Sequence, residues 1–188
     1  MNPLEITGVA FGIAFVWLAI REHPWCWPAG LVNVLIFAVL FWRVRLFGSA
    51  GLQLVYAALA VYGWYAWLHG GADHGALRVS RVPRAVLVWL LAAGAAAALV
   101  LGVVLRQAGA ALPMIDAAAT AFSLVAQALQ TRKWIENWVA WVIVDAVFVA
   151  EYASQGLAVT SGLYVVYTVM AALGWRAWRR SMAGAATA

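Results

Sequence analysis

The stretch from Asp116 to Tyr152 decides the fold, and it reads DAAATAFSLVAQALQTRKWIENWVAWVIVDAVFVAEY. It contains two apolar segments, joined by the short charged turn Thr131-Arg132-Lys133. Each segment is long enough to cross a lipid bilayer, because about 20 residues at about 1.5 Å each span the hydrocarbon core. The stretch therefore predicts two consecutive transmembrane helices.

Polar and aromatic side chains recur along both segments at helical spacing. They are Asp116, Thr120, Ser123 and Gln127 in the first segment, and Asn137, Trp141, Asp145, Phe148 and Tyr152 in the second. Spacings of three and four residues place each set on one helical face. A carboxylate in a membrane segment costs several kcal/mol unless it is paired with another group or in contact with water. We therefore interpret the two faces as the lining of a solute site. For a single Thr or Ser, an interhelical hydrogen bond that stabilises packing is the preferred interpretation.

The composition is that of a polytopic membrane protein. Hydrophobic residues make up 66% of the chain and charged residues only 10%, whereas soluble proteins carry roughly 25% charged residues. The single cysteine, Cys26, excludes an intrachain disulfide and a cysteine metal cluster. The net charge of +5 comes from arginine-rich loops. It therefore reports membrane topology and gives no reason to expect nucleic acid as a partner.

Seven transmembrane segments are predicted, which makes the fold all-α. They are Leu4–Ile20, Trp27–Trp42, Gly48–Leu68, Val86–Leu105, Leu112–Leu129, Trp134–Tyr152 and Leu157–Trp175. The first lacks signal-peptide features, so we expect it to be retained. Residues 181–188 are expected to form a disordered tail. When the loops alternate sides, nine Lys and Arg residues fall on one side and three on the other. The positive-inside rule then predicts an outer N-terminus and a cytoplasmic C-terminus.

The chain repeats at one constant offset in residue number, which carries position 51 onto position 162. Residues 51–56 (GLQLVY) align with 162–167 (GLYVVY), and residues 63–67 (GWYAW) align with 174–178 (GWRAW). The same offset pairs Trp27 with Trp138 and Glu5 with Asp116. We therefore expect residues 1–68 and 112–180 to be two three-helix repeats, and residues 69–111 to be a linker that carries the fourth helix. A single linker helix makes the repeats parallel, an arrangement in which transporters hold the solute between the halves.

The first half has its own candidate residues. Asn33 lies near the middle of the second segment, and Gln53 and Tyr56 share a face of the third. Tyr56 and Tyr167 are repeat-equivalent. This is consistent with a symmetric pair around a solute or with two copies of a packing contact, and both interpretations stay open.

Four motifs together indicate a family. They are residues 127–138 (QALQTRKWIENW) followed by Trp141 and Asp145, residues 27–30 (WPAG) with Asn33, residues 62–64 (YGW), and residues 174–179 (GWRAWR). In these motifs the chain resembles the PnuC family of bacterial vitamin transporters over nearly its whole length. The block from Arg132 to Trp138 is the most specific part of the resemblance.

The resemblance implies a seven-helix, three-plus-one-plus-three architecture related to the SWEET sugar transporters. It also implies uptake of nicotinamide riboside by facilitated diffusion across the bacterial inner membrane, with trapping by phosphorylation in the cytoplasm. Relatives carry thiamine or riboflavin instead. A homo-oligomer such as a trimer, surrounded by membrane lipid and without a cofactor, is the expected form.

Nicotinamide riboside has a cationic aromatic ring, a carboxamide and a ribose, and the candidate residues match all three. The ring would stack on Trp or Tyr faces, with a cation–π gain of about 0.5–2 kcal/mol. Gln127 or Asn137 suits the carboxamide, and Asn33, Thr120 or Asp145 suits the ribose hydroxyls. The candidate substrate-binding set is Gln127, Asn137, Trp138, Trp141, Thr120, Asp145 and Tyr167 from the second half, and Trp27, Asn33, Gln53 and Tyr56 from the first. Trp178 is assigned to the membrane-interface belt.

Other protein classes fit less well. A membrane enzyme is not favoured, because His23, His69 and His74 all fall in loops and form no metal-binding pair at helical spacing. A retinal photoreceptor needs a buried lysine, and the single lysine, Lys133, lies at a loop. A SWEET-like sugar carrier remains a structural rival, because sugars also stack on Trp.

Overall fold

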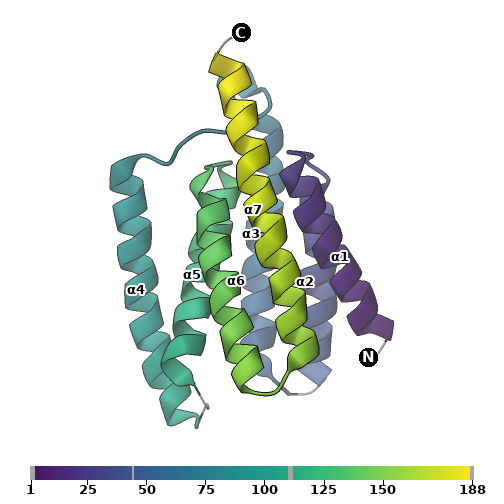
Figure 1. Ribbon diagram of the computed structural model, residues 1–188, viewed down its shortest axis with the longest axis vertical. Coiled ribbons are helices and arrows are strands. Elements are labelled where there is room, and N and C mark those ends of the chain that lie inside the picture. Colours follow the sequence, from purple (N-terminus) through teal and green to yellow (C-terminus); the bar gives the residue numbers. More distant parts are fainter. Residues whose placement is uncertain (1–2, 44, 110–111, 187–188) are drawn as a thin grey trace. The chain divides into compact units, whose positions relative to one another are not determined.

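The computed structural model describes residues 3–43, 45–109 and 112–186 of the chain (Figure 1). Within these residues the chain forms seven α-helices and one short 3-10 helix, η1. Their bounds are α1 (Pro3–Ile20), α2 (Cys26–Arg43), α3 (Phe47–His69), η1 (Ala72–His74), α4 (Arg84–Gln107), α5 (Pro113–Thr131), α6 (Glu136–Ser154) and α7 (Ala158–Ala186). The prediction of an all-α fold with seven membrane helices is confirmed.

Helix composition separates the helices into two groups. Among the described residues, α1, α2, α4 and most of α7 are long and apolar enough to cross a membrane by length and composition alone. The helices α3, α5 and α6 do not meet the same criteria of length and apolar composition. These three carry most of the predicted polar site residues, for example Gln53, Gln127 and Asp145. The polar candidates therefore lie on the helices that lipid alone would stabilise least.

The chain divides into two compact units. The first comprises Met1–Val79 together with Thr131–Lys133, and the second comprises Ser80–Gln130 together with Trp134–Ala188. Within the first unit, α1 packs on α2 and α2 packs on α3. Within the second unit, α6 packs on α7. The short turn between α5 and α6 thus belongs to the unit that holds α1–α3.

The repeat is visible in the backbone of the turns. Glu22 and Lys133 are equivalent at the repeat offset, and both have left-handed backbone angles, with φ of 56° and 50°. Arg45 and Gly156 are also equivalent at this offset and have φ of 62° and 75°. Residues other than glycine rarely adopt positive φ. Positive φ at equivalent positions of both turns therefore indicates that α1–α2–α3 and α5–α6–α7 are two copies of the same three-helix unit.

Hydrogen bonds in these turns follow the same offset. His23 N donates to Leu18 O at 3.0 Å, and Trp134 N donates to Leu129 O at 3.1 Å. The later turns agree as well, because the bond from Leu46 N to Phe41 O and the bond from Leu157 N to Tyr152 O are both 2.9 Å long. The sequence repeat is therefore also a repeat of backbone structure.

Each copy buries a tryptophan against a glycine. A Cβ atom added to Gly63 would lie 2.5 Å from the Trp27 ring, and one added to Gly174 would lie 2.6 Å from the Trp138 ring. Both tryptophans are 1% exposed. Only glycine leaves room for the tryptophan ring at these two positions, because any Cβ atom would overlap it. Small residues commonly allow such close contacts between membrane helices.

A second tryptophan completes each contact. The Trp27 and Trp67 rings meet edge to face, with centroids 5.4 Å apart at 89°, and the Trp138 and Trp178 rings meet at 5.3 Å and 85°. This geometry suits the aromatic quadrupole. Trp178 is 0% exposed. The assignment of Trp178 to the interface belt is therefore wrong, because the repeat places it where Trp67 lies in the first copy.

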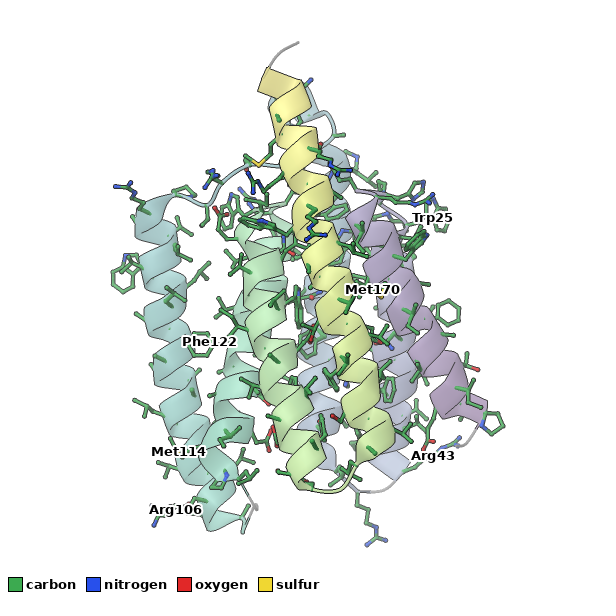
Figure 2. All side chains as sticks on the ribbon, in the orientation of Figure 1. Trp25, Arg43, Arg106, Met114, Phe122 and Met170 are labelled. Carbon is green, nitrogen blue, oxygen red and sulfur yellow. The ribbon has the colours of Figure 1, made fainter. Side chains whose placement is uncertain are left out.

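Helix α4 packs on α5 through its own small residues. A Cβ on Gly94 would meet the side chains of Val125 and Phe122, and one on Gly102 would lie 2.5 Å from Met114 Sδ. Phe122 and Met114 are labelled along α5 in Figure 2. Because Gly94 and Gly102 both face α5, α4 belongs to the second unit as a packed helix.

Helix α7 is longer than the predicted seventh segment. It continues eleven residues beyond Trp175, to Ala186, and so includes residues that were expected to form a disordered tail. The added stretch contains Ala, Arg and Met, which are strong helix formers, and it has no proline. Residues 187 and 188 lie outside the described part of the chain.

Candidate functional site

The turn between α5 and α6 holds the most specific sequence block. Backbone N–H groups in this block are anchored to the stretch before α4, since Ile135 N donates to Ser80 O at 2.9 Å. Val82 N donates to Glu136 Oε2 at 3.0 Å across the same pair of segments. These bonds fix the start of α6 and therefore the first-turn residues of that helix.

Asn137 lies in this first turn and is fully buried. Its Nδ2 donates to Trp134 O at 2.6 Å, whereas its Oδ1 accepts no hydrogen bond from the described residues. A buried amide oxygen without a donor costs about 1–3 kcal/mol. The Asn137 carbonyl is therefore suited to accept a hydrogen bond from a solute amide.

Trp141 lies one turn further along α6. Its Nε1 donates to Gln130 Oε1 at 2.9 Å, which ties α6 to α5 and fixes the orientation of the indole. Trp141 is half-buried, whereas Gln130 is 1% exposed. A ring held by its N–H and left partly accessible is a suitable surface for stacking an aromatic solute.

Gln127, Thr120 and Asp145 complete the second-half candidates on α5 and α6. Gln127 is 6% and Asp145 4% exposed. Thr120 is half-buried, and its hydroxyl donates to Asp116 Oδ1 at 3.4 Å. The structure thus buries the side chains of Gln127 and Asp145. The Thr120 hydroxyl donates within its own helix and not to a neighbouring helix, so this bond is not the interhelical contact that was expected for a single hydroxyl.

Trp27 and Trp138 have roles beyond any contact with a solute. Both are packed on glycine and on a neighbouring tryptophan, so they belong to the core of their helix sets. Yet the Nε1–H of each is buried without an acceptor in the described residues. Each copy of the repeat therefore offers one unused donor at the equivalent position.

The remaining candidates lie as follows. Asn33 Nδ2 donates to Gly8 O at 2.7 Å, which makes this amide an interhelical bond between α2 and α1. Gln53 and Tyr56 are half-buried on α3. Tyr167 is half-buried on α7, and its ring meets Tyr164 edge to face at 5.9 Å.

Several polar residues were not among the predicted site residues. Gln130 lies inside the quoted block, but its partner Trp141 becomes evident only across two helices. Lys133 Nζ lies 3.3 Å from Glu22 Oε2 and 4.6 Å from the centroid of the Trp67 ring. Glu151 is 7% exposed, and its Oε2 has no partner within the described chain. For Glu22 and Lys133, their equivalence at the repeat offset was a signal already present in the sequence.

The fold and these buried polar groups define a multi-pass membrane transporter. Residues 2–180 match the sequence profile described as nicotinamide mononucleotide transporter, and the chain belongs to this family.

Individual relatives agree over nearly the full length. The chain is 30% identical to the nicotinamide riboside transporter PnuC of Escherichia coli K12, over 96% of this chain and 87% of that protein. It is also 30% identical to the riboflavin/roseoflavin transporter RibM of Streptomyces davaonensis, over 93% of this chain and 83% of RibM. A crystal structure of the vitamin B3 transporter PnuC superposes with a TM-score of 0.74 at 22% identity, covering 95% of this chain and 83% of that one. This structural likeness supports the fold.

Proposed function

We propose that the protein takes up nicotinamide riboside across the bacterial inner membrane by facilitated diffusion. The similarity to the Escherichia coli PnuC over 96% of this chain carries the proposal. The buried Asn137 Oδ1 supports it, because a carboxamide N–H would supply the donor that the described residues do not. The half-buried Trp141 ring supports it as a stacking surface for the pyridinium ring.

Binding variants test the site. Gln127→Ala and Asn137→Ala should each weaken nicotinamide riboside binding about 5- to 100-fold, because a polar group of the solute loses its partner. Trp141→Ala should weaken binding further through lost stacking. Gln107→Ala is the matched control, because Gln107 is exposed at the end of α4. Isothermal calorimetry of purified protein measures the effect, with size-exclusion profiles as the folding control. Normal binding by both amide variants would contradict the site.

Downhill transport without ion coupling is the proposed mechanism. Proteoliposomes with equal nicotinamide riboside on both sides should show no net accumulation under a Na⁺ or proton gradient. Uphill accumulation would contradict this mechanism and would point to Asp116, Asp145 or Glu151 as a coupling group. Trapping by phosphorylation is tested by enclosing a nicotinamide riboside kinase with ATP, which should make net uptake continue beyond equal concentrations.

Riboflavin is the second candidate solute, because RibM is as similar in sequence as the Escherichia coli PnuC. Competition against labelled nicotinamide riboside separates the candidates. The competitors are riboflavin, thiamine and a hexose, each compared with unlabelled nicotinamide riboside. Stronger competition by any of these than by unlabelled nicotinamide riboside would assign the chain to that solute.

The outer N-terminus, the cytoplasmic C-terminus and a homo-oligomeric state are also part of this proposal. The nine-to-three distribution of Lys and Arg supports the orientation. Multi-angle light scattering of detergent-purified protein, corrected for bound detergent, measures the number of chains in the oligomer.

A further inference from the structure

The second unit contains a group of aromatic and acidic side chains far from Asn137. Glu151 lies 14 residues after Asn137 on α6, which corresponds to about 21 Å along the helix. We name the group the acidic–aromatic cluster, and it comprises Phe148, Tyr152, Tyr164, Asp116 and Glu151.

Three rings form the aromatic part. The centroids of Phe148 and Tyr164 are 4.8 Å apart, and Tyr152 stacks on Tyr164 at 5.4 Å and 25°. Phe148 and Tyr152 stack at 5.8 Å and 20°. All three side chains are half-buried, so part of each ring remains accessible.

Two carboxyl groups form the acidic part. Glu151 directly precedes Tyr152 on α6, and Asp116, in the first turn of α5, lies within electrostatic range of Glu151 and of the Tyr152 hydroxyl. Glu151 Oε1 accepts a hydrogen bond from Gln155 at 3.4 Å, but its Oε2 is buried and has no partner in the described residues. Burying an unpaired carboxylate is costly, and a cation held beside it would offset that cost.

The other copy of the repeat shows what packing alone requires. Phe37 and Phe41 are the equivalents of Phe148 and Tyr152, and their rings also lie close together, at 6.0 Å and 36°. The equivalent of Glu151 is Leu40. The first copy thus keeps the ring pair and has Glu5 where the second copy has Asp116, but it has no counterpart of the Glu151 carboxyl group. That carboxyl group is therefore not required by the contact between the rings.

We infer that the acidic–aromatic cluster is a second binding site, which takes the cationic ring of the solute before it reaches the residues near Asn137. Aromatic faces and nearby carboxylates are the groups that favour an organic cation over a neutral ring. In the proposed orientation this end of α6 faces the outside of the cell. The inference rests on the proposed uptake of nicotinamide riboside, whose pyridinium ring carries the positive charge.

The test compares two probes of nearly the same shape. One is nicotinamide riboside, which is cationic, and the other is its 1,4-dihydro form, which is neutral. Initial uptake rates into proteoliposomes give a KM for each probe. Glu151→Gln should raise the KM for the cation about 5- to 20-fold and that for the neutral form less than about twofold.

Further variants keep the test decisive. Asp116→Asn should act in the same direction with a smaller effect, because Asp116 is only half-buried. Tyr152→Leu should raise the KM for the cation, whereas Phe41→Leu, at the equivalent position of the first copy, should not. Glu151→Gln removes a buried charge and keeps the shape of the side chain, so its melting temperature should be no lower than that of the wild type.

The outcomes separate this inference from the proposed function. If the wild-type protein transports no nicotinamide riboside, the proposed function fails. If the wild type transports it and Glu151→Gln changes the KM of both probes equally, or of neither, the cation site is overturned. Loss of uptake for both probes would identify Glu151 as a packing or proton-handling group and would also overturn the site.

Discussion

Glu22 and Lys133 occupy equivalent positions in the two copies of the repeat, and they form an ion pair with 3.3 Å between Oε2 and Nζ. Lys133 is 6% exposed, and its ammonium group also lies 4.6 Å from the centroid of the Trp67 ring. Beside it, Arg132 donates to the Tyr62 hydroxyl at 2.9 Å. Polar contacts, and not only apolar packing, therefore hold the α5–α6 turn in the unit that contains α1–α3.

Removing this pair should destabilise the protein. Lys133→Gln leaves Glu22 without its cation, and Glu22→Gln leaves a buried lysine unpaired, so we expect each to cost about 1–3 kcal/mol. The melting temperature in detergent should fall by several degrees. Arg180→Gln makes the same change of charge at an exposed position and should have little effect.

A charge exchange completes that experiment. The double variant Glu22→Lys with Lys133→Glu should recover part of the lost melting temperature, because the two charges again attract each other. Equal melting temperatures for the double variant and the worse single variant would show that the pair contributes nothing.

The glycines under the tryptophans give matched predictions. Gly63→Ala and Gly174→Ala should each destabilise the protein by about 1–3 kcal/mol, because the new Cβ would overlap the ring of Trp27 or Trp138.

Gly51 and Gly162 are the controls, since they are also equivalent in the repeat and have open space where a Cβ would lie. Alanine there should be neutral or slightly stabilising, because alanine favours helix over glycine. Thermal unfolding of the four variants checks the prediction, which fails if the buried and open positions respond alike.

Trp178 should be a stability residue. Trp178→Ala removes a fully buried ring that packs edge to face on Trp138, so we expect a loss of about 3–5 kcal/mol. Trp89→Ala is the comparison, because Trp89 is 76% exposed on α4 and should change stability by about 0.5 kcal/mol or less. A melting temperature near that of the wild type for Trp178→Ala would contradict the packing described above.

Orientation in the membrane can be measured directly. A fluorescent-protein fusion after residue 188 should be bright, and a periplasmic phosphatase at the same place should be inactive, because the basic loops predict a cytoplasmic C-terminus. An active phosphatase would reverse the orientation and would move the acidic–aromatic cluster to the cytoplasmic side.

The helices and their repeat could be predicted from the sequence, because both depend on local pattern. Apolar segments of about 20 residues define membrane helices, and the constant offset aligns Trp27 with Trp138 from the residue order alone. Helix ends were less predictable. The continuation of α7 to Ala186 depends on the helix propensity of a stretch that lacks apolar periodicity.

The candidate site was predicted only as a set of residue types. Helical spacing places Asn137, Trp141 and Asp145 on one face, but spacing cannot show which polar atoms already have partners. The bond from Asn33 to Gly8 and the bond from Trp141 to Gln130 join different helices, so neither follows from the period of one helix. Trp178 was misplaced for the same reason, although its alignment with Trp67 already suggested a shared environment.

The two edge-to-face tryptophan pairs also have an optical consequence. Indoles held rigidly in a core give near-ultraviolet circular dichroism that disappears when tertiary packing is lost. Trp27 with Trp67 and Trp138 with Trp178 are two such pairs of closely matched geometry, one in each copy of the repeat. Trp27→Phe would remove the signal of one pair and Trp138→Phe that of the other. The difference between the wild-type spectrum and each variant spectrum would therefore report the packing of one tryptophan pair, without any added label.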